Sequence, residues 1–174
     1  MLKIFLRGNT MNPKIKTILY ATDMGNHMRP VFRYAIEMAR KNKARIIMLH
    51  VIEPLSSSAL ATINVYMPKF NAKEVRRDGM KKALKNMQKR LNKFCDDEKI
   101  KDPDDCEIIS SVKVVSGHSA ESIVHQAEQL SADLIVVGSN TKPSVNTNLL
   151  GSTARGVTQN SKVPVLVVPI YQSA

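Results

Sequence analysis

The chain has 174 residues, enough for one α/β domain with a full hydrophobic core. Its composition, 43% hydrophobic and 24% charged, is that of a globular protein, and its apolar runs are too short to cross a bilayer, which argues against a membrane protein. The N-terminal segment MLKIFLRGNT lacks the apolar region and cleavage site of a secretory signal. The two cysteines, Cys95 and Cys106, show no metal-ligand spacing. We therefore predict a cytoplasmic protein with an N-terminal extension over residues 1–15, where Met11 is an alternative start, and a single domain over residues 16–174.

The net charge of +11 is concentrated in one segment. Between Lys73 and Lys93 there are nine lysines and arginines against two acidic residues. Such a run is typical of a solvated helix face, and the alternative is a nucleic-acid surface. Only Phe70 and Phe94 lie nearby to stack on bases, so we expect no specific nucleic-acid binding.

The first half of the chain predicts two buried strands around a helix. Residues Thr17–Thr22 and Arg45–Val51 are apolar runs without alternation, typical of strands covered on both faces. Turn residues 24–26 precede a helix that begins at Arg29 or Pro30, since proline is favoured in a first turn. Residues 53–70 indicate an irregular crossover or lid with room for one helical turn. On the helix, the positions expected to face the core are Val31, Tyr34, Ala35, Met38 and Ala39.

The second half continues the alternation of helices and strands. The longest helix is predicted over Glu74–Cys95, with an apolar stripe, and is followed by a charged loop over residues 96–106. The strand at Glu107–Val115 is the most polar, which favours a sheet edge. A helix follows over Ala120–Leu130 with Ser119 as its N-cap, and the apolar runs at 134–137 and 165–168 are the last two strands. The alternation predicts a parallel sheet with right-handed crossovers. The stripe of the longest helix consists of Met80, Leu84, Met87, Leu91 and Phe94.

Two loops carry residues suited to ligand binding. Asp23 follows the first strand, and Gly138 follows the fourth, where a glycine allows a turn and a close approach of ligand. Gly151 and Ser152 open a helix, whose unpaired N–H groups favour anions. If the first and fourth strands are neighbours, both loops meet at a switch point of the sheet, and the backbone near Val51 lines the same crevice. Asp23 would then bind adenine or ribose, and the loop glycines and Ser152 would hold phosphates.

Each of these residues also has a structural interpretation. Asp23 is equally explained as a turn or N-cap residue, and the two glycines as turn and cap residues. The sequence contains no Walker A loop, dinucleotide fingerprint, nucleophile elbow or histidine metal motif, and His50 is best explained as a packed core histidine. We therefore name no catalytic residue and no metal ligand.

Several segments together resemble the universal stress protein family, over nearly all of Lys16–Ile170. The resemblance rests on Asp23, on His50-Val51, and on the runs ADLIVVGS at 132–139, LLGSTA at 149–154 and VPVLVVP at 163–169. ATP-binding members of the family show a glycine, two residues, a second glycine, nine residues, and then glycine with serine or threonine. Gly138, Gly151 and Ser152 match this pattern.

This chain departs from the family pattern at two positions. Thr141 replaces the middle glycine, and Gly156 replaces an asparagine often found in binding members. A threonine in a left-handed conformation costs on the order of 1 kcal/mol, but its hydroxyl is a potential phosphate ligand. We keep Thr141 among the expected nucleotide-binding residues.

The resemblance implies an open, Rossmann-like five-stranded parallel sheet of order 3-2-1-4-5, with helices on both faces, as in the adenine nucleotide alpha hydrolase-like proteins. It also implies a homodimer formed through the last strand, Val165–Val168. The implied function is a stress-response regulator or sensor that binds ATP or another adenine nucleotide, with or without Mg²⁺, and hydrolyses it slowly at most. The alternatives are a dimeric interaction protein that binds no nucleotide and an adenylyl-transferring enzyme. The enzyme would require a histidine pair that Gly25-Asn26-His27 does not supply.

Overall fold

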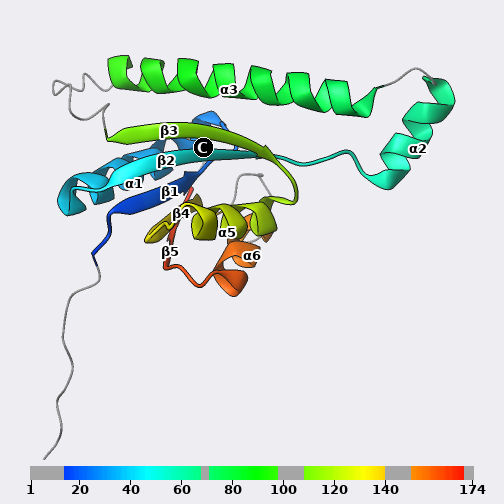
Figure 1. The fold of residues 1–174 in the computed structure, drawn as a ribbon. Coiled ribbons are helices and arrows are strands. Elements are labelled where there is room, and N and C mark those ends of the chain that lie inside the picture. Colours follow the sequence, from blue (N-terminus) through cyan, green and yellow to red (C-terminus); the bar gives the residue numbers. More distant parts are fainter. Residues whose placement is uncertain (1–13, 68–70, 98–107, 140–149, 171–174) are drawn as a thin grey trace, which may run out of the picture.

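The computed structural model describes residues 14–67, 71–97, 108–139 and 150–170, and it shows one parallel sheet of five strands in the order β3-β2-β1-β4-β5 (Figure 1). The expected fold class and strand order are confirmed. The strands are β1 (Thr17–Ala21), β2 (Arg45–Ile52), β3 (Ile109–Ser116), β4 (Leu134–Gly138) and β5 (Val165–Val168). The helices are η1 (Asn26–Met28), α1 (Arg29–Asn42), α2 (Ser57–Tyr66), α3 (Ala72–Asp97), α5 (Ser119–Gln129) and α6 (Ser152–Asn160).

The central strand β1 explains why unbroken apolar runs form this sheet. All five of its residues are buried, because β2 and β4 flank it and helices cover both faces. Leu19 lies between Ile47 of β2 and Ile135 of β4. The more polar β3 lies at one edge, as predicted, and β5 lies at the other. The carboxyl ends of β1 and β4 are therefore neighbours, which creates the switch point that the predicted site requires.

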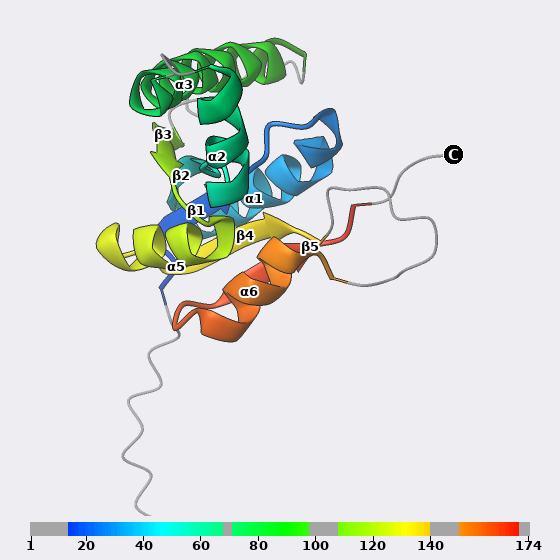
Figure 2. The same cartoon turned by 90° about the vertical axis from the view of Figure 1, so that its right-hand side faces the viewer.

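The sheet has two covered faces, each with its own core (Figure 2). Helices α1 and α3 cover one face, where Tyr20, Phe32 and Met87 are buried. Helices α5 and α6 cover the other, where Leu49, Ile123 and Val157 are buried. Alternate residues of β1 point to opposite faces, so one strand contributes to both cores.

Three sequence predictions about local structure are wrong. On α1, Val31, Ala35 and Ala39 are buried and Met38 packs against the core as predicted, but Tyr34 is 57% exposed, and the buried Phe32 and Ile36 were not among the predicted positions. The segment predicted as an irregular crossover contains the ten-residue helix α2, whose N-cap Ser56 accepts a hydrogen bond from the backbone N–H of Ala59 at 3.2 Å. Ser119 is the first residue of α5 and not its N-cap, because its hydroxyl donates to the Glu53 carboxylate at 2.7 Å.

Most of the predicted extension, residues 1–13, lies outside the described residues, as does most of the loop at 96–106. Ile15, which was assigned to the extension, packs against the core of the α1/α3 face. The structured chain therefore begins slightly earlier than predicted. Among the described helices, none is both long enough and apolar enough to span a bilayer.

Candidate functional site

A small cavity of about 110 Å³ lies at the carboxyl ends of β1, β2 and β4. Three residues predicted from separate loops, Asp23, Val51 and Gly138, all line it. The parallel topology brings them together, because neighbouring strands end at the same edge of the sheet. The cavity is also lined by Ala21, Thr22, Met28, Leu49, His50, Ser119, Ile123, Val137, Thr153 and Ala154.

The Asp23 carboxylate is held by its own loop. One oxygen accepts the backbone N–H of Gly25 at 2.7 Å, and the other lies 3.0 Å from Nε2 of His27. Between them, Met24 has a left-handed backbone with φ of 65°. Asp23 is thus a turn residue, and it also lines the cavity with its side chain 41% exposed. A ligand that hydrogen-bonds to this carboxylate shares it with Gly25 and His27.

The side chain of His50 connects the ends of β1 and β2 through a hydrogen bond. Its Nδ1 lies 2.8 Å from the carbonyl oxygen of Thr22. Because a carbonyl only accepts, Nδ1 carries the hydrogen, so in the neutral ring Nε2 is the acceptor. A second bond runs from the Thr22 N–H to the Leu49 carbonyl at 2.9 Å. The side chain is half-buried and lines the cavity, so His50 is a structural residue at the edge of the core rather than deep within it.

Gly138 is required for close packing. None of the described glycines has a positive φ, so the turn argument made from the sequence does not apply. A Cβ added at Gly138 would lie 2.5 Å from Cδ1 of Ile170 and 3.2 Å from Sδ of Met28. A side chain here would displace both neighbours and fill the space beside the cavity.

The start of α6 forms another wall of the site. Gly151 is the residue before the helix, with φ of −58°, and its N–H donates to the Ser139 carbonyl at 2.7 Å. That N–H is therefore already bonded, which leaves the following turn of α6 to supply free donors. Thr153 and Ala154 line the cavity, whereas Gly151 and Ser152 lie beside it. Thr141 lies outside the described residues.

Gly156 has a structural explanation in α6. A Cβ at this position would lie 2.7 Å from the Cβ of Ala120 on α5. The two helices approach so closely that the asparagine which the resemblance leads us to expect at this position does not fit without a shift. The departure from the family pattern is therefore coupled to the packing of α5 against α6.

Sequence reasoning missed several residues of the site. Thr22, His50, Thr153 and Ser119 all line the cavity, and each offers a polar side chain. Thr22 was assigned to the first strand, but β1 ends at Ala21, which makes Thr22 the first residue of the loop. A polar residue next to Asp23 at a strand end was a usable signal. Within the described part of the chain, no group of three histidine, cysteine or acidic residues could hold a metal ion. The polar side chains around the cavity can offer hydrogen bonds to a ligand.

Comparison with known proteins gives a consistent result. The model of the universal stress protein family matches residues 14–169. The universal stress protein YxiE of Bacillus subtilis is 26% identical over 152 residues, which covers 87% of this chain and 97% of that protein. Two solved structures share the fold. The universal stress protein UspA of Lactobacillus plantarum has a TM-score of 0.66 at 20% identity, over 90% of this chain and 99% of the other. A universal stress protein in complex with cAMP has a TM-score of 0.56 at 21% identity, over 91% and 99%.

Proposed function

The chain belongs to the universal stress protein family, and from this premise we propose that it is a cytoplasmic binder of ATP or a related adenine nucleotide. It acts as a regulator or sensor in a stress response, with slow hydrolysis at most. The observation that carries the proposal is the convergence of Asp23, Val51 and Gly138 on one cavity at the switch point between β1 and β4. The complex of a structurally similar family member with cAMP supports the choice of an adenine nucleotide.

The cavity suggests how the nucleotide is placed. At about 110 Å³ it is smaller than whole-ligand pockets, which span roughly 300–1,000 Å³. It accommodates one ring system, with the Asp23 carboxylate and the backbone at Val51 offering acceptors to an adenine amino group or a ribose hydroxyl. The phosphates then extend past Gly138 toward Ser152 at the start of α6, where backbone N–H groups favour anions. Mg²⁺ would enter with the phosphates, held by them and by water.

The edge strand β5 supports a homodimer as part of the same proposal. β5 pairs with β4 on one side, and its other backbone edge has no partner strand among the described residues. Three of its four residues are only half-buried in the single chain. A second copy paired along Val165–Val168 would cover this edge.

The first test is titration calorimetry with ATP, AMP and cAMP on the purified protein, with Asp23→Ala and Asp23→Asn beside it. Asp23→Ala removes the ligand contact and the bond to the Gly25 N–H, and we expect roughly tenfold weaker binding. Asp23→Asn keeps an oxygen that can accept the hydrogen bond from the Gly25 N–H. The comparison of the two variants therefore distinguishes a loss of loop structure from a loss of the contact with the ligand. Asp78→Ala on α3 removes an exposed carboxylate that does not line the cavity, and should bind like the unchanged protein. Equal affinities in all four proteins would remove Asp23 from the site.

Thr141→Gly tests the loop itself. Restoring the family's glycine should tighten ATP binding several-fold, since 1.4 kcal/mol is about tenfold and the strain of a left-handed threonine is of similar size. Weaker binding by the variant would assign the Thr141 hydroxyl to the phosphates.

One observation favours the alternative of an interaction protein without nucleotide. Both oxygens of Asp23, and the Gly151 N–H, already have partners within the chain. Undetectable binding of every adenine nucleotide, by the unchanged protein and by Thr141→Gly, would select this alternative. Heat denaturation of freshly purified protein, followed by analysis of the supernatant for released nucleotide, is the complementary measurement.

A further inference from the structure

A second and larger cavity, of about 440 Å³, lies on the α1/α3 face of the sheet. Its volume is within the range of roughly 300–1,000 Å³ typical of small-molecule pockets. It is bounded by the start of α1, by the second half of α3, and by side chains of β1 and β2. Only Thr22 and Met28 are shared with the cavity at the strand ends.

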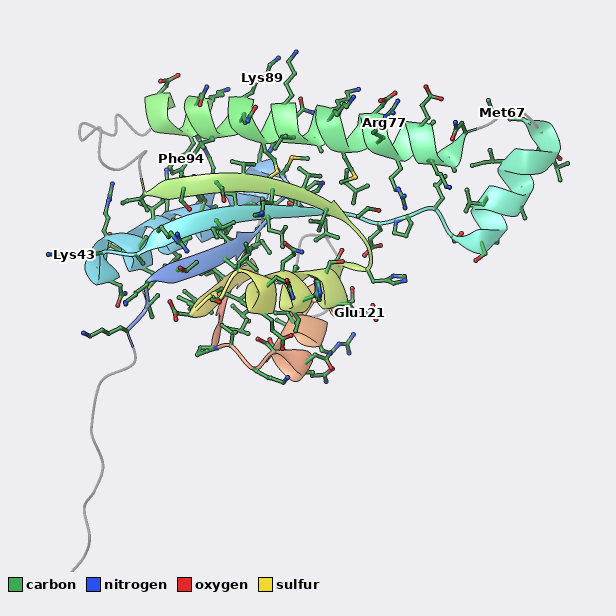
Figure 3. All side chains as sticks on the ribbon, viewed as in Figure 1. Lys43, Met67, Arg77, Lys89, Phe94 and Glu121 are labelled. Atoms are coloured by element: carbon green, nitrogen blue, oxygen red, sulfur yellow. The ribbon has the colours of Figure 1, made fainter. Side chains whose placement is uncertain are left out.

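The inner wall is apolar and adaptable. The ring of Phe32 stacks on Tyr20 at 5.1 Å between centroids and meets Phe94 edge-on at 4.5 Å. Figure 3 shows Phe94 between α3 and the sheet. Met48 and Met87 lie on the same wall, and methionines adjust their shape to an irregular ligand. Such a wall accepts a hydrocarbon tail and offers it few polar groups.

The rim is positively charged. Arg90 and Lys93 are exposed, line the cavity, and lie one turn apart on α3. Arg29 lies on the opposite rim, with its guanidinium 5.8 Å from the centre of the Phe94 ring. No aspartate or glutamate is among the described residues that line the cavity, and neither Arg90 nor Lys93 forms an ion pair with a described residue.

We propose that this cavity binds an amphipathic monoanion, a carboxylate with a medium-length aliphatic tail. The tail lies against Tyr20, Met48 and Met87, and the carboxylate meets Arg90 and Lys93 at the rim. The apolar wall favours the tail, and the positive charges of Arg90 and Lys93 at the rim favour the negative head. The lining of this site differs from that of the proposed nucleotide site, because Asp23, Val51 and Gly138 do not line it, although Thr22 and Met28 are shared.

The direct test is a titration with decanoate, below its micellar concentration, of protein carrying ¹³C-labelled methionine methyl groups. The methyl signals of Met48 and Met87, assigned by single Met→Leu substitutions, should shift. Met67 is exposed at the end of α2 and does not line the cavity, so the chemical shift of its methyl signal should not change (Figure 3). Hexanoate should bind more weakly, by roughly fourfold for each buried methylene group lost. Decyltrimethylammonium carries the same tail with the opposite charge and should bind at least tenfold more weakly. Binding of the cation as tight as that of decanoate would overturn the proposal, as would saturable binding that leaves Met48 and Met87 unmoved.

Matched variants on one helix test the rim. The double variant Arg90→Gln/Lys93→Gln should weaken decanoate binding roughly fivefold to tenfold, the effect of two exposed charges. The control Lys85→Gln/Lys89→Gln removes the same charge from α3 at residues that do not line the cavity, and Lys89 points away from the sheet (Figure 3). It should leave decanoate affinity unchanged within twofold. An equal loss of decanoate affinity in both double variants would mean that the anion is attracted by the overall charge of α3. That result would overturn the proposal that Arg90 and Lys93 bind the carboxylate.

A nucleotide is the competing occupant. ATP is also an anion, and if it displaced decanoate and shifted Met87, the cavity would belong to the nucleotide site and the proposal would be wrong. We expect ATP to leave Met87 unmoved, and decanoate to bind the unchanged protein and Asp23→Asn equally, since asparagine keeps an oxygen that can accept from the Gly25 N–H. Failure of ATP to bind anywhere would leave this result untouched, so the two proposals fail separately.

Discussion

The two cavities differ in what builds them, although both adjoin the end of β1. The smaller one is made by loops that follow strands, and its polar residues come from sequence positions that the topology forces together. The larger one is made mainly by side chains of α1, α3 and the core of one face, together with Thr22 and residues 24–26 of the loop that follows β1. The α5/α6 face shows the opposite packing, with two helices so close that a glycine separates them. Loose packing on one face and tight packing on the other therefore distinguish the two sides of the sheet.

The largest expected effect comes from removing the aromatic centre of the α1/α3 face. Phe32→Ala deletes a ring that contacts both Tyr20 and Phe94, and should lower the free energy of unfolding by about 3 kcal/mol. Urea denaturation measures it, with Phe32→Leu as a control that should cost less than about 1.5 kcal/mol. A loss below about 1 kcal/mol for the alanine variant would mean that this face is not held together by its rings.

Two glycine substitutions, one on α6 and one on α3, compare how closely the two helices are packed. Gly156→Ala brings a Cβ to 2.7 Å from Ala120, and should destabilise the protein by about 1–3 kcal/mol despite a better helix propensity. Gly79→Ala on α3 meets no atom within 4 Å, and should stabilise it by about 0.5–1 kcal/mol. Thermal unfolding of the two variants should shift in opposite directions. Shifts of the same sign would contradict the contrast between the faces.

The ionisation of Tyr20 has almost no effect on stability near neutral pH and acts only at alkaline pH. Burial raises the pKa of its phenol well above the ordinary value, with the nearby Asp23 charge adding to this. In the unfolded chain the phenol ionises near its ordinary pKa of about 10, so the stability it contributes is present below that pH and is lost as pH rises above it. Each further pH unit should cost about 1.4 kcal/mol until the folded pKa is reached.

Tyr20→Phe isolates that contribution. The variant loses the phenol and its long bond of 3.4 Å to the Met28 carbonyl, which should cost about 1 kcal/mol at pH 7. Above pH 10 the variant should lose stability more slowly than the unchanged protein in the same urea series. Parallel curves for the two proteins would show that Tyr20 ionises equally well in the folded state.

The contrast between the cavities also explains how much of the fold and of the candidate site could be predicted from the sequence. Apolar runs such as Leu134–Val137 predict buried parallel strands, because burial on both faces removes the need for alternation. Asp23 and Gly138 could be paired because strand ends meet at one edge. The larger cavity left no sequence signal, since Met87 and Phe94 read as ordinary core positions of a helix.

Other differences arose from contacts between distant residues. The hydroxyl of Ser119 bonds to Glu53, which is 66 positions away, so the local capping rule does not apply. The buried face of α1 is broad, and Phe32 packs there against the rings of Tyr20 and Phe94. The buried residues of α1 nevertheless have helical spacing, so the sequence pattern alone already favours Phe32 over Tyr34.

The shared wall between the cavities has a thermodynamic consequence. Thr22 and Met28 each line both, and the backbone N–H of Met24 donates to the Thr22 hydroxyl at 3.0 Å. A ligand that moved this wall would change the shape of the opposite cavity, so the two proposed ligands bind independently only while Thr22 and Met28 keep their positions. Linkage then requires that the factor by which a carboxylate alters nucleotide affinity equals the factor by which the nucleotide alters carboxylate affinity. A single coupling constant, measured from either direction, would test the independence of the two cavities, and a value of one would confirm it.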